Sequence, residues 1–113
     1  MPGLILSTTA RAGVLGFAKA LADEVAPEGI TVNVVCPGFI ATERIEDLTE
    51  TRAKREHRSS QEVMREMVAD IPMGRMGRTD ELAAAVVFLA SERASYITGA
   101  VVQVDGGFTR SIF

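Results

Sequence analysis

The sequence is poor in cysteine and aromatic residues and has no long apolar run. Its 113 residues include one cysteine, Cys36, one tyrosine and no tryptophan. With one cysteine no disulfide can form within the chain, so we expect a reducing compartment, the cytoplasm. The apolar stretches are far shorter than the roughly 20 residues that cross a bilayer, and no signal peptide opens the sequence. Composition therefore predicts neither a membrane protein nor a secreted one.

Neither sign of charge is in large excess. The formal net charge is −3, from 12 basic and 15 acidic residues. This balance gives no electrostatic reason to expect nucleic acid or an anionic membrane as a partner. Hydrophobic residues make up 47% of the chain, which is a globular composition, and 113 residues fit one domain. We assign no metal ligands.

An amphipathic helix is predicted from about Thr9 to Ala26. Apolar residues recur there three and four positions apart, with charged residues on the opposite face. Ser7, Thr8 or Thr9 would cap its start, and the Pro-Glu-Gly sequence after Ala26 would end it. Its small residues would let another backbone approach closely; they are Ala12, Gly13, Gly16, Ala18 and Ala20.

A nearly continuous apolar run begins at Ile30 and predicts a strand buried on both faces. Pro37 and Gly38 would end it, because proline has no N–H for the ladder and glycine admits unusual backbone angles. A second strand is predicted over residues 100–104, after a turn in which Tyr96 is expected to pack. Ligands of open α/β sheets bind at the carboxyl ends of strands, so the residues after Gly38 are candidates for a site wall. The alternative is that Pro37 and Gly38 only end a strand.

A charged segment follows the first strand. Residues 43–58 are dense in charge of both signs, which is typical of a solvated helix or loop face. The second interpretation is a lid over the strand ends, since lids are drawn from weakly packed segments. His57 lies in this segment and is expected to be solvated rather than catalytic.

Two further helices are predicted before the second strand. One would be capped by Ser59 or Ser60 and end at Pro72, and the next would run from Thr79 to near Ser91. The order of helix, strand, charged segment, helices and strand predicts an α/β fold with a parallel sheet.

Five stretches carry a resemblance to a known family, in matching order and spacing: residues 11–22, 29–38 with Thr42, 82–91, 95–99 and 104–107. In them the chain resembles the C-terminal half of the short-chain dehydrogenase/reductases, especially bacterial 3-oxoacyl-acyl-carrier-protein reductases. The resemblance implies that residues 1–113 form a partial domain, the C-terminal half of a doubly wound, Rossmann-like parallel sheet. It also implies that residues 43–71 are the lid, or substrate loop.

The resemblance implies a nicotinamide cofactor, NAD or NADP, in the complete protein. Pro37 and Gly38 would mark where the chain passes the nicotinamide. The backbone near Ile40 would meet its carboxamide, and the hydroxyl of Thr42 would reach the carboxamide or the pyrophosphate. The family's glycine-rich pyrophosphate loop does not occur in this sequence, so we expect the chain alone to bind the cofactor poorly.

The family's Tyr-x-x-x-Lys pair is replaced here by Ser7 and Arg11, as in a divergent Ser-x-x-x-Arg subgroup. Ser7 would orient the substrate oxygen, but a serine hydroxyl is a far poorer acid than a tyrosine beside a lysine. Arg11 would bind the ribose through a fixed, permanently charged fork. We therefore predict Ser7 and Arg11 as catalytic residues, with Arg11 also binding the cofactor.

Two functions remain open. The first is an oxidoreductase that transfers hydride between the cofactor and a small carbonyl or alcohol substrate, with this chain as a half that lacks turnover alone. The second is a non-catalytic member or fragment that serves as a structural or assembly module. Two strands do not make a stable sheet by themselves, so we expect either a homo-oligomer formed through the open strand edge and the small-sided helix, or an isolated chain of marginal stability.

Overall fold

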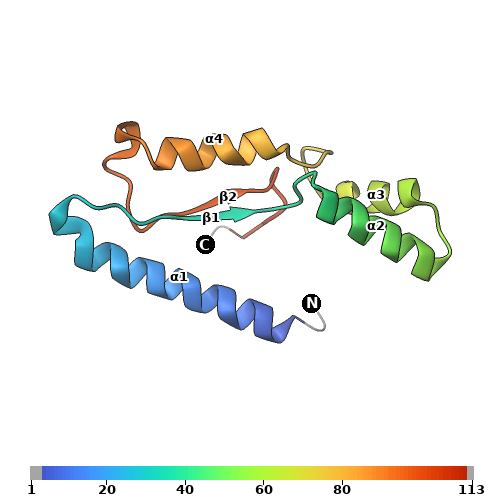
Figure 1. Cartoon of the computed structure of the whole chain (residues 1–113), viewed down its shortest axis with the longest axis horizontal. Coiled ribbons are helices and arrows are strands. Elements are labelled where there is room, and N and C mark those ends of the chain that lie inside the picture. Colours follow the sequence, from blue (N-terminus) through green and yellow to red (C-terminus); the bar gives the residue numbers. More distant parts are fainter. Residues whose placement is uncertain (1–3, 112–113) are drawn as a thin grey trace. The chain divides into compact units, whose positions relative to one another are not determined.

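The computed structural model describes residues 4–111. Its elements, in chain order, are α1 (Ile5–Val25), η1 (Ala26–Glu28), β1 (Val34–Pro37), α2 (Glu43–Glu56), α3 (Ser60–Ala69), α4 (Thr79–Leu89), η2 (Glu92–Ala94) and β2 (Val101–Val104) (Figure 1). The chain divides into two compact units, which are described separately. The first unit is Met1–Val35 with Val86–Val102, and the second is Cys36–Ala85 with Gln103–Phe113.

Strands β1 and β2 lie side by side and run in the same direction (Figure 1). The N–H of Val34 donates to the carbonyl of Ala100, and the N–H of Gly38 donates to the carbonyl of Val104, both at 2.9 Å. Parallel neighbours need a long crossover, which the segment with α2, α3 and α4 supplies. The predicted α/β fold with a parallel sheet is confirmed.

Helix α1 begins earlier than the sequence predicted. It starts at Ile5 instead of Thr9, and its N-cap, Leu4, makes no side-chain capping bond. The predicted cap is therefore wrong: the Thr9 hydroxyl donates at 2.8 Å to the carbonyl of Ile5, one turn back inside the helix. The end of the helix at Val25 agrees with the prediction, and Gly29 completes the turn with a φ of 76°.

Strand β1 is shorter than predicted, because residues 30–33 are joined to the segment before β2 by side-chain hydrogen bonds and by one backbone bond, from the N–H of Gly99 to the carbonyl of Val32 at 2.7 Å. The hydroxyl of Thr98 accepts from the N–H of Val32 at 3.0 Å. The amide of Asn33 donates to the carbonyl of Ile97 and accepts from the N–H of Ala100, both at 3.0 Å. Pro37, predicted to stop the strand, is its last residue.

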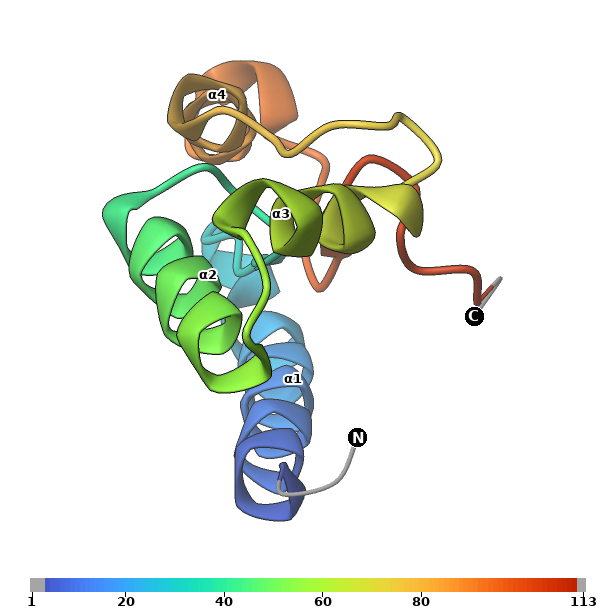
Figure 2. The same ribbon diagram turned by 90° about the vertical axis from the view of Figure 1, so that its right-hand side faces the viewer.

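Helices α2 and α3 form an antiparallel hairpin, residues 43–69, in which the two helices lie side by side (Figure 2). Ser59 caps α3 as predicted, accepting from the N–H of Glu62 at 3.2 Å. His57 ends α2 in the left-handed conformation, with a φ of 54°, and is exposed as expected. Because α2 spans most of residues 43–58, the charged segment is a helix rather than a loop.

The described chain buries few large side chains. The buried apolar residues are Ala18, Ala22, Ile40, Ala53, Val63, Ile71 and Ala94. Tyr96 is fully exposed, so its predicted packing role is wrong within residues 4–111. In the same part of the chain no helix has the length and apolar character to cross a membrane.

Candidate functional site

The loop after β1 begins at a point of close approach between two backbones. A Cβ atom on Gly38 would lie 2.6 Å from the Cβ of Asp105 and 2.8 Å from its Cα. Only glycine fits there, since real Cβ atoms do not approach other atoms so closely. The neighbour that requires Gly38 in this structure is therefore the chain itself, just after β2, while Pro37 beside it is exposed.

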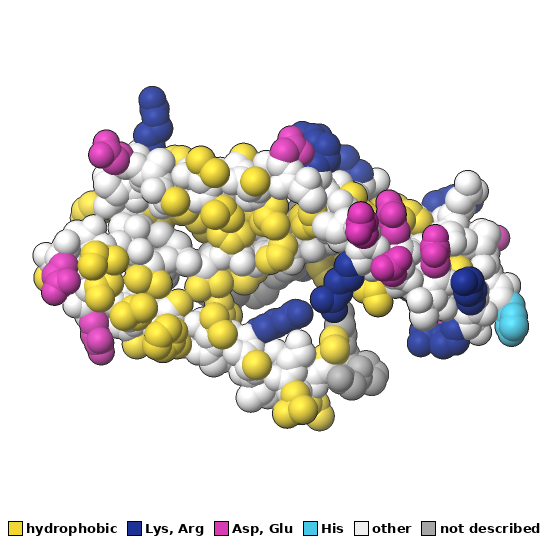
Figure 3. All heavy atoms as spheres, in the orientation of Figure 1, with side chains coloured by type: hydrophobic (Ala, Val, Ile, Leu, Met, Phe, Trp, Pro, Cys, Tyr) yellow, Lys and Arg dark blue, Asp and Glu magenta, His cyan; other side chains and the backbone are white. Residues whose placement is uncertain are grey.

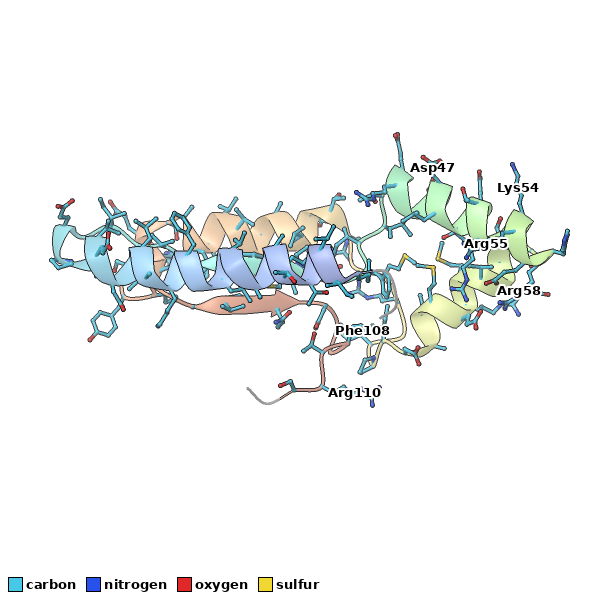
Figure 4. All side chains as sticks on the ribbon, turned by 90° about the horizontal axis from the view of Figure 1, so that it is seen from below. Asp47, Lys54, Arg55, Arg58, Phe108 and Arg110 are labelled. Atoms are coloured by element: carbon cyan, nitrogen blue, oxygen red, sulfur yellow. The ribbon has the colours of Figure 1, made fainter. Side chains whose placement is uncertain are left out.

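Asp105 organises the loop after β2. Its carboxylate accepts at 2.9 Å from the N–H groups of Gly107 and Thr109. Hydrogen bonds from Thr109, more than those from Gly107 and Phe108, hold the pKa of Asp105 below its ordinary value. The Phe108 ring meets Phe39 edge-to-face, with centroids 5.5 Å apart, and so ties this loop to the loop after β1 (Phe108 is labelled in Figure 4).

Ile40 forms an isolated parallel bridge with Gly77. The N–H of Gly77 donates to the carbonyl of Phe39 and the carbonyl of Gly77 accepts from Ala41, both at 2.9 Å. In a parallel bridge of this kind the N–H and C=O of Ile40 itself point away from Gly77. Within residues 4–111 neither group has a backbone partner, and the residue as a whole is 8% exposed. Ile40 thus offers an adjacent donor and acceptor.

Thr42 is exposed and caps α2. Its hydroxyl oxygen accepts from the N–H of Ile45 at 3.4 Å, a long contact. The hydroxyl proton is then free to be donated elsewhere. Ile40 and Thr42 lie with Gly38 in one short loop of the second unit, directly after Pro37 at the end of β1.

Ser7 and Arg11 belong to the first unit, on successive turns of α1. Four positions apart on a helix, their side chains share one face. Ser7 is half-buried and Arg11 is exposed, and neither side chain makes a hydrogen bond or ion pair within the described residues. The structure therefore places the Ser7 and Arg11 side chains next to each other on α1.

The predicted lid is the α2–α3 hairpin, with the residues that follow it to Ile71. Between its helices lies an open hollow of about 410 Å³, whose lining includes Thr49 and Met64 with the charged Glu46, Glu50 and Arg65. The Thr49 hydroxyl lies 3.7 Å from the sulfur of Met67. Figure 3 shows acidic and basic side chains interspersed on the surface of this hairpin.

Two residues that organise these loops were not predicted from the sequence. Asn33 joins the approach to β1 to the turn before β2, and Asp105 fixes the loop after β2. A polar amide inside a β-branched run was the available signal for Asn33. For Asp105 the signal was an acidic residue directly before two glycines.

Comparison with known proteins places this fold in a family. A family model described as enoyl-(acyl carrier protein) reductase matches residues 1–109. The 3-oxoacyl-[acyl-carrier-protein] reductase FabG of Haemophilus influenzae is 47% identical over 106 residues, 94% of this chain and 39% of that protein. The acetoacetyl-CoA reductase of Shinella zoogloeoides is 46% identical over 101 residues, 88% of this chain and 37% of that protein. The chain thus spans less than two fifths of these relatives.

Solved structures agree with the sequence relatives. A short chain dehydrogenase family protein from Francisella tularensis superimposes with a TM-score of 0.92 at 29% identity, covering 98% of this chain and 46% of that one. YwfH, described as an NADPH dependent reductase of bacilysin biosynthesis, gives a TM-score of 0.81 at 42% identity, over 89% of this chain and 38% of that one. This chain belongs to the short-chain dehydrogenase/reductase family, in which it resembles the 3-oxoacyl-acyl-carrier-protein reductases.

Proposed function

We propose that this chain supplies the nicotinamide-side wall and the substrate lid of an NAD(P)-dependent reductase for a small carbonyl or alcohol substrate. The observation that carries the proposal is the backbone of Ile40, whose N–H and C=O are turned away from the bridge to Gly77. A carboxamide needs one acceptor and one donor side by side, and Ile40 presents that pair. The Thr42 hydroxyl, two residues on, would donate to the carboxamide or the pyrophosphate.

The chemistry divides between cofactor and chain. When bound, the reduced nicotinamide supplies the hydride that adds to the carbonyl carbon. The Ser7 hydroxyl would hydrogen-bond the substrate oxygen, which needs a proton as the alcohol forms. Arg11 would donate to ribose hydroxyls and place a fixed positive charge near that oxygen. Because a serine hydroxyl is a weak acid, we expect the proton to come from water held by Ser7, and turnover to be slow.

An assembly role is the second candidate, and exposed apolar residues on α1 favour it. Ile5, Leu6, Val14 and Phe17 are each at least 57% exposed. A Cβ on Gly13 would meet nothing within 4 Å. A homo-oligomer through this helix would cover some of these side chains, and it is compatible with the reductase role. The expected cytoplasmic location also stays a prediction.

A hybrid protein tests the reductase role. In the Haemophilus influenzae relative, the segment matched by this chain would be replaced by this chain, and calorimetry would measure the binding of NADH and NADPH. We expect the hybrid to release heat of binding, whereas the chain alone gives none. A hybrid that folds, as judged by circular dichroism, but binds neither cofactor would refute the proposal.

Substitutions in the same hybrid test the catalytic pair. Ser7→Ala should lower the rate of acetoacetyl-CoA reduction at least tenfold, as expected for loss of a group acting on the substrate oxygen. Ser7→Tyr with Arg11→Lys should raise it, because a tyrosine beside a lysine is the better acid. Unchanged turnover in Ser7→Ala would remove Ser7 from the mechanism.

A further inference from the structure

Four charged side chains of the α2–α3 hairpin close into a ring, here called the charge ring. Arg52 and Glu56 belong to α2, Arg58 follows the turn (labelled in Figure 4), and Glu66 belongs to α3. The N···O distances around the ring are 3.2 Å (Arg52–Glu56), 3.1 Å (Glu56–Arg58), 2.6 Å (Arg58–Glu66) and 3.2 Å (Glu66–Arg52). Within the ring each arginine contacts two carboxylates and each carboxylate contacts two arginines; Arg58 also lies 3.8 Å from Glu62, outside the ring.

The ring joins two helices that bury few side chains completely. The buried side chains of the hairpin are Thr49, Ala53 and Val63, none of them large. Only Val63 is fully enclosed. The Arg52–Glu66 pair connects α2 to α3 directly, and the pairs of Arg58 connect the turn to both helices. The fully buried core of the hairpin is small, and the ring adds contacts between its two helices.

We propose that the charge ring is a latch that holds α3 against α2, and that breaking it opens the hairpin without unfolding the rest of the chain. In a closed ring every side chain is positioned by two partners, so the loss of one member takes a partner from each of its two neighbours. Ion pairs at the surface are individually weak, and a connected network is the arrangement in which they count.

The electrostatics of the ring agree with this role. Hydrogen bonding by Arg52, and then by Arg58, lowers the pKa of Glu56. Hydrogen bonding to Glu66, and then to Glu56, raises the pKa of Arg58. The four side chains are between 32% and 51% exposed, so dissolved ions can reach them. The screening length falls from about 10 Å at 0.1 M salt to about 3 Å at 1 M, so the latch should weaken with salt.

The latch itself does not depend on the proposed enzymatic role. Its use as a device that admits substrate does rest on the proposed function, because the hairpin is the segment predicted to be the lid. The two ideas fail separately: cofactor calorimetry on the hybrid tests the reductase, and local opening of the hairpin tests the latch.

Hydrogen exchange of backbone amides in the whole chain is the test, because it reports local opening helix by helix. Arg58→Met keeps much of the side-chain volume and removes the charge; we expect it to speed exchange in α3 about fivefold while α1 is unchanged. Arg52→Met should act in the same direction. In the double variant Arg52→Met/Arg58→Met, the exchange rate of α3 should rise by less than the product of the two single increases, since the first substitution already opens the ring. Salt at 1 M should speed exchange in the wild type but not in the double variant.

Arg65→Met is the matched control. Arg65 is an exposed arginine on α3 that forms none of the ion pairs of the hairpin, so its loss should leave α3 exchange unchanged. The proposal is overturned if Arg58→Met does not speed exchange in α3, if Arg65→Met speeds it as much, or if α1 and α3 accelerate together. Unprotected α3 amides in the wild type would overturn it as well.

Discussion

Helix α1 and the α2–α3 hairpin differ in the kind of side chain that each presents. Helix α1 carries large apolar side chains and buries only Ala18 and Ala22 within the described residues. The hairpin carries charges of both signs, and it ties its own helices together with them. The first is a surface that gains free energy by being covered, whereas the second links its own helices through ion pairs. We expect added salt and single substitutions to affect α1 and the hairpin differently.

The largest effect should come from a charge placed inside the hairpin. Val63→Asp buries an unpaired carboxylate at a fully enclosed position, and we expect it to cost about 3 kcal/mol of stability and to melt α3. Val14→Asp makes the same change on α1, where Val14 is 57% exposed, and should leave the fold of the single chain nearly unchanged. Urea unfolding followed by circular dichroism measures both. Equal losses in the two variants would show that α1 is as tightly packed as the hairpin.

A pair of glycine substitutions should act with opposite signs. Gly38→Ala forces a Cβ against the backbone of Asp105 and should destabilise the chain by about 2 kcal/mol. Gly13→Ala, inside α1 with nothing within 4 Å, should stabilise the helix by about 1 kcal/mol, since alanine is the better helix former. The same unfolding measurement gives both values. A stabilising Gly38→Ala would contradict the close approach described for this loop.

How far the sequence predicted this structure depends on the range of the interactions. Local patterns identified α3 with its cap at Ser59, because capping and helical periodicity involve residues a few positions apart. The start of β1 was wrong, since residues 30–33 are held by Thr98 and by the contacts of Asn33 with Ile97 and Ala100, more than 60 positions away. No local pattern contains such a partner.

The candidate site shows the same division. Strand order and the resemblance pointed to the loop after β1, and the free backbone pair of Ile40 lies in that loop. The reason for Gly38 was not predictable, because Asp105 approaches it from a distant part of the chain. The charge ring was equally hidden: the density of charge in residues 43–58 was visible, but the partner Glu66 lies beyond that segment. The roles of Ser7, Arg11 and Thr42 stay predictions.

Association should respond to α1 and not to the hairpin. Phe17→Lys replaces an aromatic residue that is 68% exposed by a charged one, and we expect it to weaken self-association about tenfold, through the loss of apolar area from the contact. Sedimentation velocity over a concentration series measures the change. Arg58→Met is the control and should leave the association constant unaltered. Salt at 1 M should preserve or strengthen association while it loosens the hairpin, because apolar contacts are not screened.

The smallest expected effect concerns Glu81, a residue outside the hairpin whose carboxylate accepts hydrogen bonds from two arginines. Both its oxygens accept from Arg75, at 2.7 and 2.9 Å, and Oε1 also accepts from the N–H of Arg78 at 2.9 Å. These contacts, first that of Arg75, lower the pKa of Glu81 from its ordinary 4.5 to about 2. Because the folded-state pKa is depressed, the stabilisation is complete above pH 4.5 and is lost as the pH falls toward 2.

Carbon-13 NMR titration of the Glu81 carboxyl measures this directly. Arg75→Met should raise the pKa of Glu81, though not fully to its ordinary value, since the N–H of Arg78 still donates to it. Glu81→Gln should be less stable than the wild type at neutral pH, and the difference should shrink as the pH falls through the window below 4.5. A pKa that does not move in Arg75→Met would show that this pair adds nothing to the start of α4. Ion pairs would then stabilise this chain only where they form the charge ring. The difference in stabilisation between the hairpin and α1 would come from the charge ring alone.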